Sequence, residues 1–132
     1  KKFEKRDVKV EISNHCEMIK EPLGLSFQTS EDIPKEYTNT NNVVFFDADK
    51  LSFPLTVRLW KNGDKIRPLG MKGSKKISDI LIDKKIPLID KEKTFVIISN
   101  GHIIWLIGYT MNDLFKINNT TKRVYKIERI SS

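Results

Sequence analysis

The chain has 132 residues, a length typical of one domain, and its 39% hydrophobic and 31% charged residues exclude a fully disordered chain. Its single cysteine, Cys16, cannot form an internal disulfide, which excludes a secreted disulfide scaffold and indicates a reducing, cytoplasmic compartment. The longest apolar run, residues 103–107, is far shorter than the roughly 20 residues of a membrane-spanning helix, so no membrane partner is expected.

Strands dominate the predicted elements. Apolar and polar residues alternate over residues 8–12 and again over residues 55–60, as in half-buried strands. Further strands are predicted at residues 25–28, 43–46, 94–99, 102–108 and 123–127. Asn100 and Gly101 stand between two of these strands and predict a tight hairpin, because a type I′ turn needs a positive φ at both central residues.

One helix is predicted over residues 75–85. Ser74 precedes it as a candidate N-cap, and Pro87 should end it by disfavouring helical geometry at the residue before. Three apolar residues at helical spacing would form its buried face: Ile77, Ile80 and Leu81.

The order of these elements predicts an α+β fold, with a mainly antiparallel, sandwich-like sheet and one main helix, because strands do not alternate regularly with helices. Residues 29–42 are mostly polar and are predicted to form a long surface loop. We expect residues 1–132 to form a single domain. Since the chain begins with Lys1 and not with Met, we expect it to be a fragment of a longer protein.

The net charge of +7 is concentrated in the middle of the chain. Residues 53–85 contain nine basic and three acidic residues, whereas residues 1–52 contain eight basic and ten acidic residues. Within residues 60–87 a strand ends, a glycine-bearing basic loop follows, and the helix begins. Glycine permits close backbone approach, and Lys and Arg supply affinity for phosphates, so a contact with a phosphate backbone is one interpretation. A solvated turn is the other. The GxxxxGK[ST] pattern of a nucleotide-binding loop is absent from the sequence.

No residue pattern points to a catalytic or metal site. His15 and Cys16 are adjacent but have no spaced partner ligand. Trp60 lies on the polar side of its strand and is a candidate for an exposed contact with a base, whereas Trp105 is predicted to be in the core. Three carboxylates without a His or Ser partner are expected to orient basic neighbours: Asp79, Asp83 and Asp113.

Four segments together resemble the C-terminal domain of bacterial tRNA(Ile)-lysidine synthetases: PLTVRLWKNGDKIRPLGMKGSKKISDILIDKKIP, IIWLIGY, DLFKI and TKRVYKI. The matching core covers about residues 43–127. The resemblance implies an α+β domain with a β-sandwich, similar to a domain of the phenylalanyl-tRNA synthetase β chain. Within the last part of the match, the family commonly has Arg where this chain has Thr110 and Leu114.

The resemblance also implies a function. Members of the family use ATP and Mg to convert the wobble cytidine of tRNA(Ile) to lysidine, in an N-terminal domain with an SGGxDS-type pyrophosphate loop. That loop is absent from this sequence, so no catalytic residue and no cofactor are expected in this fragment. The implied partners are tRNA(Ile), through its acceptor stem, and the missing catalytic domain. A homodimer, or a structural module without RNA binding of its own, stays open as an alternative.

Nine basic residues are candidate RNA contacts. Those at positions of the family pattern are Arg58, Lys75, Lys76, Lys122 and Arg123. Those chosen from charge and loop position are Lys61, Lys65, Arg67 and Lys72. An unrelated DNA-binding domain is disfavoured, because neither helix-turn-helix spacing nor zinc ligands occur.

Overall fold

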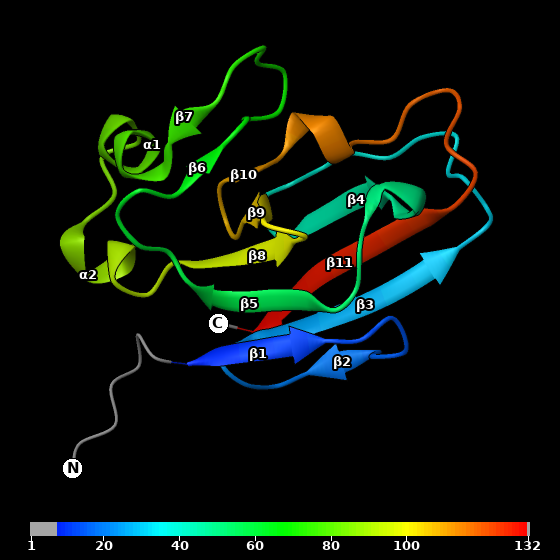
Figure 1. The fold of residues 1–132 in the computed structure, drawn as a ribbon, viewed down its shortest axis with the longest axis horizontal. Helices are drawn as coiled ribbons and strands as arrows, with labels where there is room; N and C mark the ends of the chain where they lie inside the picture. The colour runs from blue at the N-terminus through cyan, green and yellow to red at the C-terminus, as the bar shows by residue number, and fades with distance from the viewer. Residues whose placement is uncertain (1–7, 132) are drawn as a thin grey trace.

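Two antiparallel sheets packed face to face form the frame of the computed structural model, which describes residues 8–131 (Figure 1). The first sheet has the order β1-β5-β8-β9-β10, with the bounds Lys9–Ile12, Leu55–Leu59, Phe95–Ser99, His102–Leu106 and Thr110–Met111. The second has the order β2-β3-β11-β4, with the bounds Met18–Ile19, Gly24–Ser30, Val124–Ser131 and Val43–Asp47. A short pair is formed by β6 (Lys65–Ile66) and β7 (Lys75–Lys76). This arrangement confirms the predicted fold class.

The space between the two large sheets is filled by one apolar cluster. From β5 come Leu55, Val57 and Leu59, which are all buried, as the alternation of this strand predicts. Tyr125 of β11 and the fully buried Trp105 of β9 meet them from other strands. Burial of apolar surface at about 25 cal/mol per Å² is the main force that holds the sheets together.

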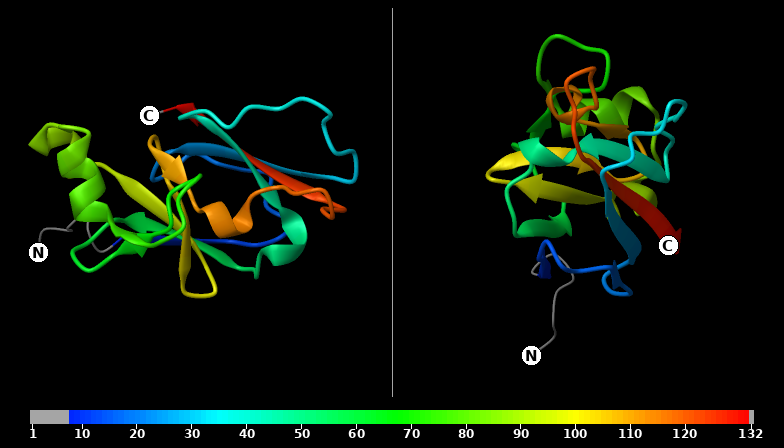
Figure 2. Two further views of the ribbon diagram at one scale, coloured as in Figure 1. Left: turned by 90° about the horizontal axis from the view of Figure 1, so that it is seen from above. Right: turned by 90° about the vertical axis from the view of Figure 1, so that its right-hand side faces the viewer.

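The outer face of the first sheet is covered by α1 (Ile77–Asp83) and the β6–β7 pair (Figures 1 and 2). A second apolar cluster joins this cover to the sheet through Ile66, Ile77, Ile80, Leu81, Val96, Ile103 and Leu106. Because β8 and β9 are buried on both faces, their sequences are nearly continuous apolar runs. Helix α1 and the β6–β7 pair are therefore packed on the first sheet, and this packing positions the basic residues of the segment 60–87.

Helix α1 is shorter than the predicted range of 75–85, and Ser74 is not its N-cap. The cap position is Lys76, which makes no side-chain cap hydrogen bond. The two residues before the helix pair with β6 as β7, and the Ile77 N–H donates to the Asp64 carbonyl at 3.0 Å. Strand pairing and this tertiary hydrogen bond replace the local cap, so tertiary contacts override the local signal.

The chain turns after α1 into a second short helix that was not predicted, α2 (Leu88–Lys91). Lys85 adopts a left-handed φ of 56°, and the helix ends before Pro87, as predicted. Trp60 is half-buried and packs against the cluster under α1, and its Nε1–H donates to the Lys91 carbonyl at 2.7 Å. The prediction that Trp60 is an exposed contact residue was wrong, because its indole fixes α2.

The connections follow the sequence signals closely. Asn100 and Gly101 join β8 to β9 with φ values of 47° and 82°, which confirms the hairpin turn. Strand β3 runs to Ser30, and residues 31–42 form the expected loop without helix or strand. Two single 3-10 turns, η2 (Ala48–Lys50) and η3 (Asp113–Phe115), follow β4 and β10. Over residues 8–131, no helix has the length and apolar character needed to cross a membrane.

Candidate nucleic-acid interface

Four exposed lysines lie on the β6–β7 pair and its flanking loops: Lys61, Lys65, Lys72 and Lys76. We call these four residues the basic hairpin surface. Within the part of the chain that the structure describes, none of them forms a salt bridge with an acidic side chain. Their charges are therefore available to an external anion.

Lys65 and Lys76 are directly opposite each other in the antiparallel register of β6 and β7. Like charges at directly opposite positions destabilise a strand pair, by up to about 1 kcal/mol. The other opposed pair is Ile66 with Lys75, and Ile66 is buried in the cluster under α1. The fold thus places two positive charges side by side where the strand pair gains nothing from them.

Arg58, a predicted RNA contact, is held inside the fold. Its Nη1 and Nη2 donate to the two carboxylate oxygens of Asp64 at 2.9 and 3.0 Å, and the side chains are only 13% and 8% exposed. Asp64 also accepts the Lys61 N–H at 2.8 Å. Such a bidentate pair is strong and fixed in direction. Arg58 therefore positions the segment that leads into β6 and is not one of the exposed cations.

Lys75, another predicted contact, forms an ion pair with Asp83 at the far end of α1. The pair is partly exposed, with 34% and 59% of the two side chains accessible. Exposed ion pairs contribute little to stability, typically about 0–1 kcal/mol. Lys75 is thus loosely engaged, in contrast to Arg58. The expectation that Asp83 orients a basic neighbour is confirmed.

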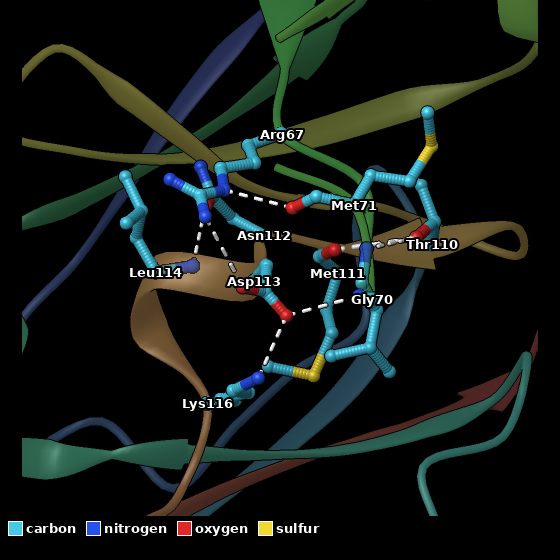
Figure 3. Close-up of polar contacts among 10 residues, drawn as sticks. Arg67, Gly70, Met71, Thr110, Met111, Asn112, Asp113, Leu114 and Lys116 are labelled. Atoms are coloured by element: carbon cyan, nitrogen blue, oxygen red, sulfur yellow. Dashed lines mark hydrogen bonds and ion pairs between the residues drawn. The ribbon is translucent and has the colours of Figure 1, made fainter. Parts of the chain in front are cut away.

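Asp113 is the centre of the contacts that hold residues 67–71, the loop that follows β6 (Figure 3). Its Oδ1 accepts the Gly70 N–H at 2.9 Å and the Lys116 ammonium at 3.0 Å. Its Oδ2 lies 3.8 Å from Nη2 of Arg67. The expectation that Asp113 orients basic neighbours is confirmed, and the carboxylate fixes loop backbone as well.

Two further contacts fix the same loop. The Leu69 N–H donates to Oγ1 of Thr110 at 3.2 Å. Nε of Arg67 donates to the Met71 carbonyl at 2.9 Å (Figure 3). Arg67, a predicted RNA contact, is therefore engaged in holding the loop, with 29% of its side chain exposed. We call residues 67–71, together with these contacts, the clamped loop.

Gly70 has a φ of 85°, in the left-handed region. We expect Gly70→Ala to lower the free energy of unfolding by about 1–2 kcal/mol, because an L-residue is strained there. A Cβ at this position meets no atom within 4 Å, so the loss reports backbone strain alone. Gly73→Ala is the matched control: its site is equally open without a positive φ, and its stability should stay the same or rise slightly. Urea denaturation measures both, and equal stability of the two variants would contradict the strain.

The Gly70 N–H, followed by the Lys116 ammonium, holds the pKa of Asp113 below its ordinary value of 3.8. A carboxyl whose pKa falls on folding contributes stability that is complete above the ordinary value and is lost as the pH falls through the lowered pKa. We therefore expect Asp113→Asn to destabilise the protein at neutral pH and to reduce the decline in stability below about pH 4. Thermal unfolding at several pH values measures this. Parallel curves for variant and parent would argue against a clamp by ionised Asp113.

Lys122 and Arg123, the last two predicted contacts, lie apart from the basic hairpin surface. Figure 1 and the left view of Figure 2 both show the start of β11 and the β6–β7 connection separated along the long axis of the molecule. Arg123 forms an ion pair with Asp49 at 2.8 Å, while Lys122 is exposed. The nine predicted contacts therefore do not form one continuous surface.

Other chemistry is sparse. Over residues 8–131, no group of three or more His, Cys, Asp or Glu side chains could hold a metal ion. Cys16 is half-buried against the main core, and His15 is exposed. Sequence reasoning gave no role to Asp64, the partner of Arg58. The available signal was a lone acidic residue between basic ones, six positions after the arginine.

The sequence profile of the family described as TilS substrate C-terminal domain matches residues 55–129. The tRNA(Ile)-lysidine synthase of Parabacteroides distasonis is 44% identical over 107 residues, which cover 79% of this chain and 24% of that protein. The tRNA(Ile)-lysidine synthase of Clostridium perfringens strain 13 is 36% identical over 125 residues, 92% of this chain and 26% of that protein. The chain thus spans about a quarter of the length of these curated relatives.

Two solved structures share the fold. A crystal structure of a TilS C-terminal domain matches with a TM-score of 0.76 at 22% identity, over 95% of this chain and 100% of that chain. An N-terminal fragment of the phenylalanyl-tRNA synthetase β-subunit from Pyrococcus horikoshii matches with a TM-score of 0.54 at 20% identity, over 64% of this chain and 27% of that chain. The fold similarity that the sequence resemblance implied is confirmed.

Proposed function

The chain belongs to the TilS substrate C-terminal domain family, and from this membership we propose that it is the tRNA-contacting domain of a bacterial tRNA(Ile)-lysidine synthase. Its partner is tRNA(Ile), held through the acceptor stem, in the cytoplasm. The ATP- and Mg-dependent conversion of cytidine to lysidine belongs to another part of the enzyme, and this chain contributes binding and selection.

The observation that carries the proposal is the opposed pair Lys65 and Lys76, flanked by the exposed Lys61 and Lys72. A like-charged pair on a strand hairpin costs stability in the isolated protein and is compensated when phosphates lie against it. The deep, narrow major groove of A-form RNA is closed to side chains, so contact is made with phosphates and the shallow minor groove. The domain therefore recognises the shape of a stem, with selectivity from the few groups that reach it.

A second candidate function is a packing module for the rest of the enzyme or for a second copy. It is favoured by apolar side chains that α1 and α2 leave in solvent: Ile82 is 59%, Leu88 70% and Ile89 64% exposed. Exposed apolar groups of this kind mark interaction surfaces when they lie together. This role is compatible with RNA binding, because the residues differ from those of the basic hairpin surface.

The test is binding of this chain to an acceptor-stem minihelix of tRNA(Ile) and to a scrambled-stem control, at two salt concentrations. The proposal expects salt-sensitive binding that prefers the correct stem. Salt-sensitive binding without preference would reduce the role to a phosphate clamp, with selection elsewhere. Absence of binding at low salt, together with self-association in sedimentation, would favour the packing module instead.

A further inference from the structure

The clamped loop holds two apolar side chains out into water. Leu69 is 40% and Met71 is 46% exposed, and Figure 3 shows Met71 pointing away from the Asp113 carboxylate. Single exposed apolar residues are common on protein surfaces and need no explanation. Here, however, hydrogen bonds fix the backbone of the residues that carry them. A surface loop without a binding role does not need to be held in this way.

The fixing contacts involve the backbone of four successive residues, 68–71. The N–H groups of Leu69 and Gly70 are bound by Thr110 and Asp113, and the Met71 carbonyl is bound by Arg67. The Met71 N–H donates to the Pro68 carbonyl at 2.9 Å. The backbone conformational entropy of Leu69 and Met71 is therefore lost during folding, before any partner arrives. Preorganisation of this kind raises affinity by lowering the cost of binding.

The surroundings of the two side chains indicate the chemistry of the partner. The next residue is the exposed Lys72, and the exposed Lys65 and Lys76 lie on the strands that the loop connects. An apolar tip that is followed by one exposed lysine, on a hairpin that carries two more, fits a polyanion that also presents an apolar surface. In a nucleic acid, that surface is the face of a base. Base faces are covered by stacking inside a duplex and become free only at a helix end or in an unpaired nucleotide.

We propose that Leu69 and Met71 form an apolar tip that packs on the exposed base face at the open end of an RNA stem, while the basic hairpin surface holds the adjacent phosphates. This rests on the proposed function and names the part of the RNA that the loop contacts. Asp113 is a positioning residue, because it touches the loop backbone and not the RNA. Packing against a base face is tolerant of sequence, so the tip selects an end and not a particular base.

The test compares two RNA probes of the same stem sequence, one with an open end and a 3′ single strand, the other a dumbbell closed by loops at both ends. The variant carries Leu69→Ser and Met71→Ser. We expect it to bind the open-ended RNA about tenfold more weakly, because the apolar burial of two side chains against the base face is lost, with no change in the dependence of log K on log salt. Binding of the dumbbell should be unaltered. A variant of the basic hairpin surface, by contrast, should flatten the dependence of log K on log salt for both RNA probes.

The matched control carries Leu88→Ser and Ile89→Ser, which remove two exposed apolar side chains from α2, outside the clamped loop, and should leave both affinities unchanged. Met71→Leu keeps an apolar tip and should retain binding. The inference is overturned if the Leu69→Ser, Met71→Ser variant binds the open-ended RNA as tightly as the parent chain does. It is also overturned if the variant loses as much affinity for the dumbbell as for the open-ended RNA, which would place the contact along the stem. If the unmodified chain binds neither probe, the proposed function fails and the inference fails with it.

Discussion

Replacing Lys65 and Lys76 with threonine should weaken RNA binding while leaving the protein at least as stable as before. Each lost phosphate contact removes roughly one unit from the slope of log K against log salt, so the slope should flatten by up to about 2 units. Affinity at about 0.1 M salt should fall roughly 10- to 60-fold. Because two opposed like charges disappear from the β6–β7 pair, the free energy of unfolding should rise, by up to about 1 kcal/mol.

Fluorescence anisotropy at several salt concentrations and urea denaturation measure these two effects. The matched control carries Lys20→Thr and Lys35→Thr, which remove the same charge from exposed positions outside the basic hairpin surface. The control should retain nearly full affinity. If both double variants bind alike, the effect belongs to net charge and not to the hairpin.

Asp64→Ala should cause the largest loss of stability, about 3 kcal/mol in the free energy of unfolding. The substitution leaves the Arg58 guanidinium largely buried without its bidentate partner, and the Lys61 N–H loses its acceptor. An uncompensated charge in this position is far more costly than an exposed one. Urea denaturation with a fixed slope of free energy against denaturant measures the loss.

Asp83→Ala is the matched control for that variant, because it also removes the carboxylate of an ion pair but at an exposed site. We expect it to cost no more than about 1 kcal/mol. The double variant Arg58→Leu with Asp64→Leu should recover much of the stability lost by Asp64→Ala, since no charge is left unpaired. A loss of under about 1 kcal/mol for Asp64→Ala would mean that water screens the pair.

The sequence was most informative where residues follow a period or a turn rule. The alternation over β5, the apolar runs of β8 and β9, and the Asn100-Gly101 turn predicted the frame of the first sheet. The two-residue strands β2, β6, β7 and β10 are too short to show a period. Ser74 is not the N-cap because the two residues that follow it form strand β7, which pairs with β6.

The candidate site was predicted in location but not in detail. Charge counts identified the segment that became the basic hairpin surface, yet they could not separate free cations from paired ones. Arg58 meets a carboxylate six residues away, and Arg123 meets one that is 74 residues away in the chain. Pairing of this kind depends on tertiary structure. For the same reason, no local pattern revealed that Asp113 reaches back to fix Gly70.

The most direct test of the central claim is to map the RNA contact on the protein. Backbone amide chemical shifts of the isotope-labelled chain would be followed by NMR while the acceptor-stem minihelix of tRNA(Ile) is added. We predict that the largest changes fall on β6, β7, the clamped loop and Lys72, with little change at Lys122 and Arg123. Changes centred on β11 and η2, or on α1 and α2, would contradict the assignment of RNA binding to the basic hairpin surface.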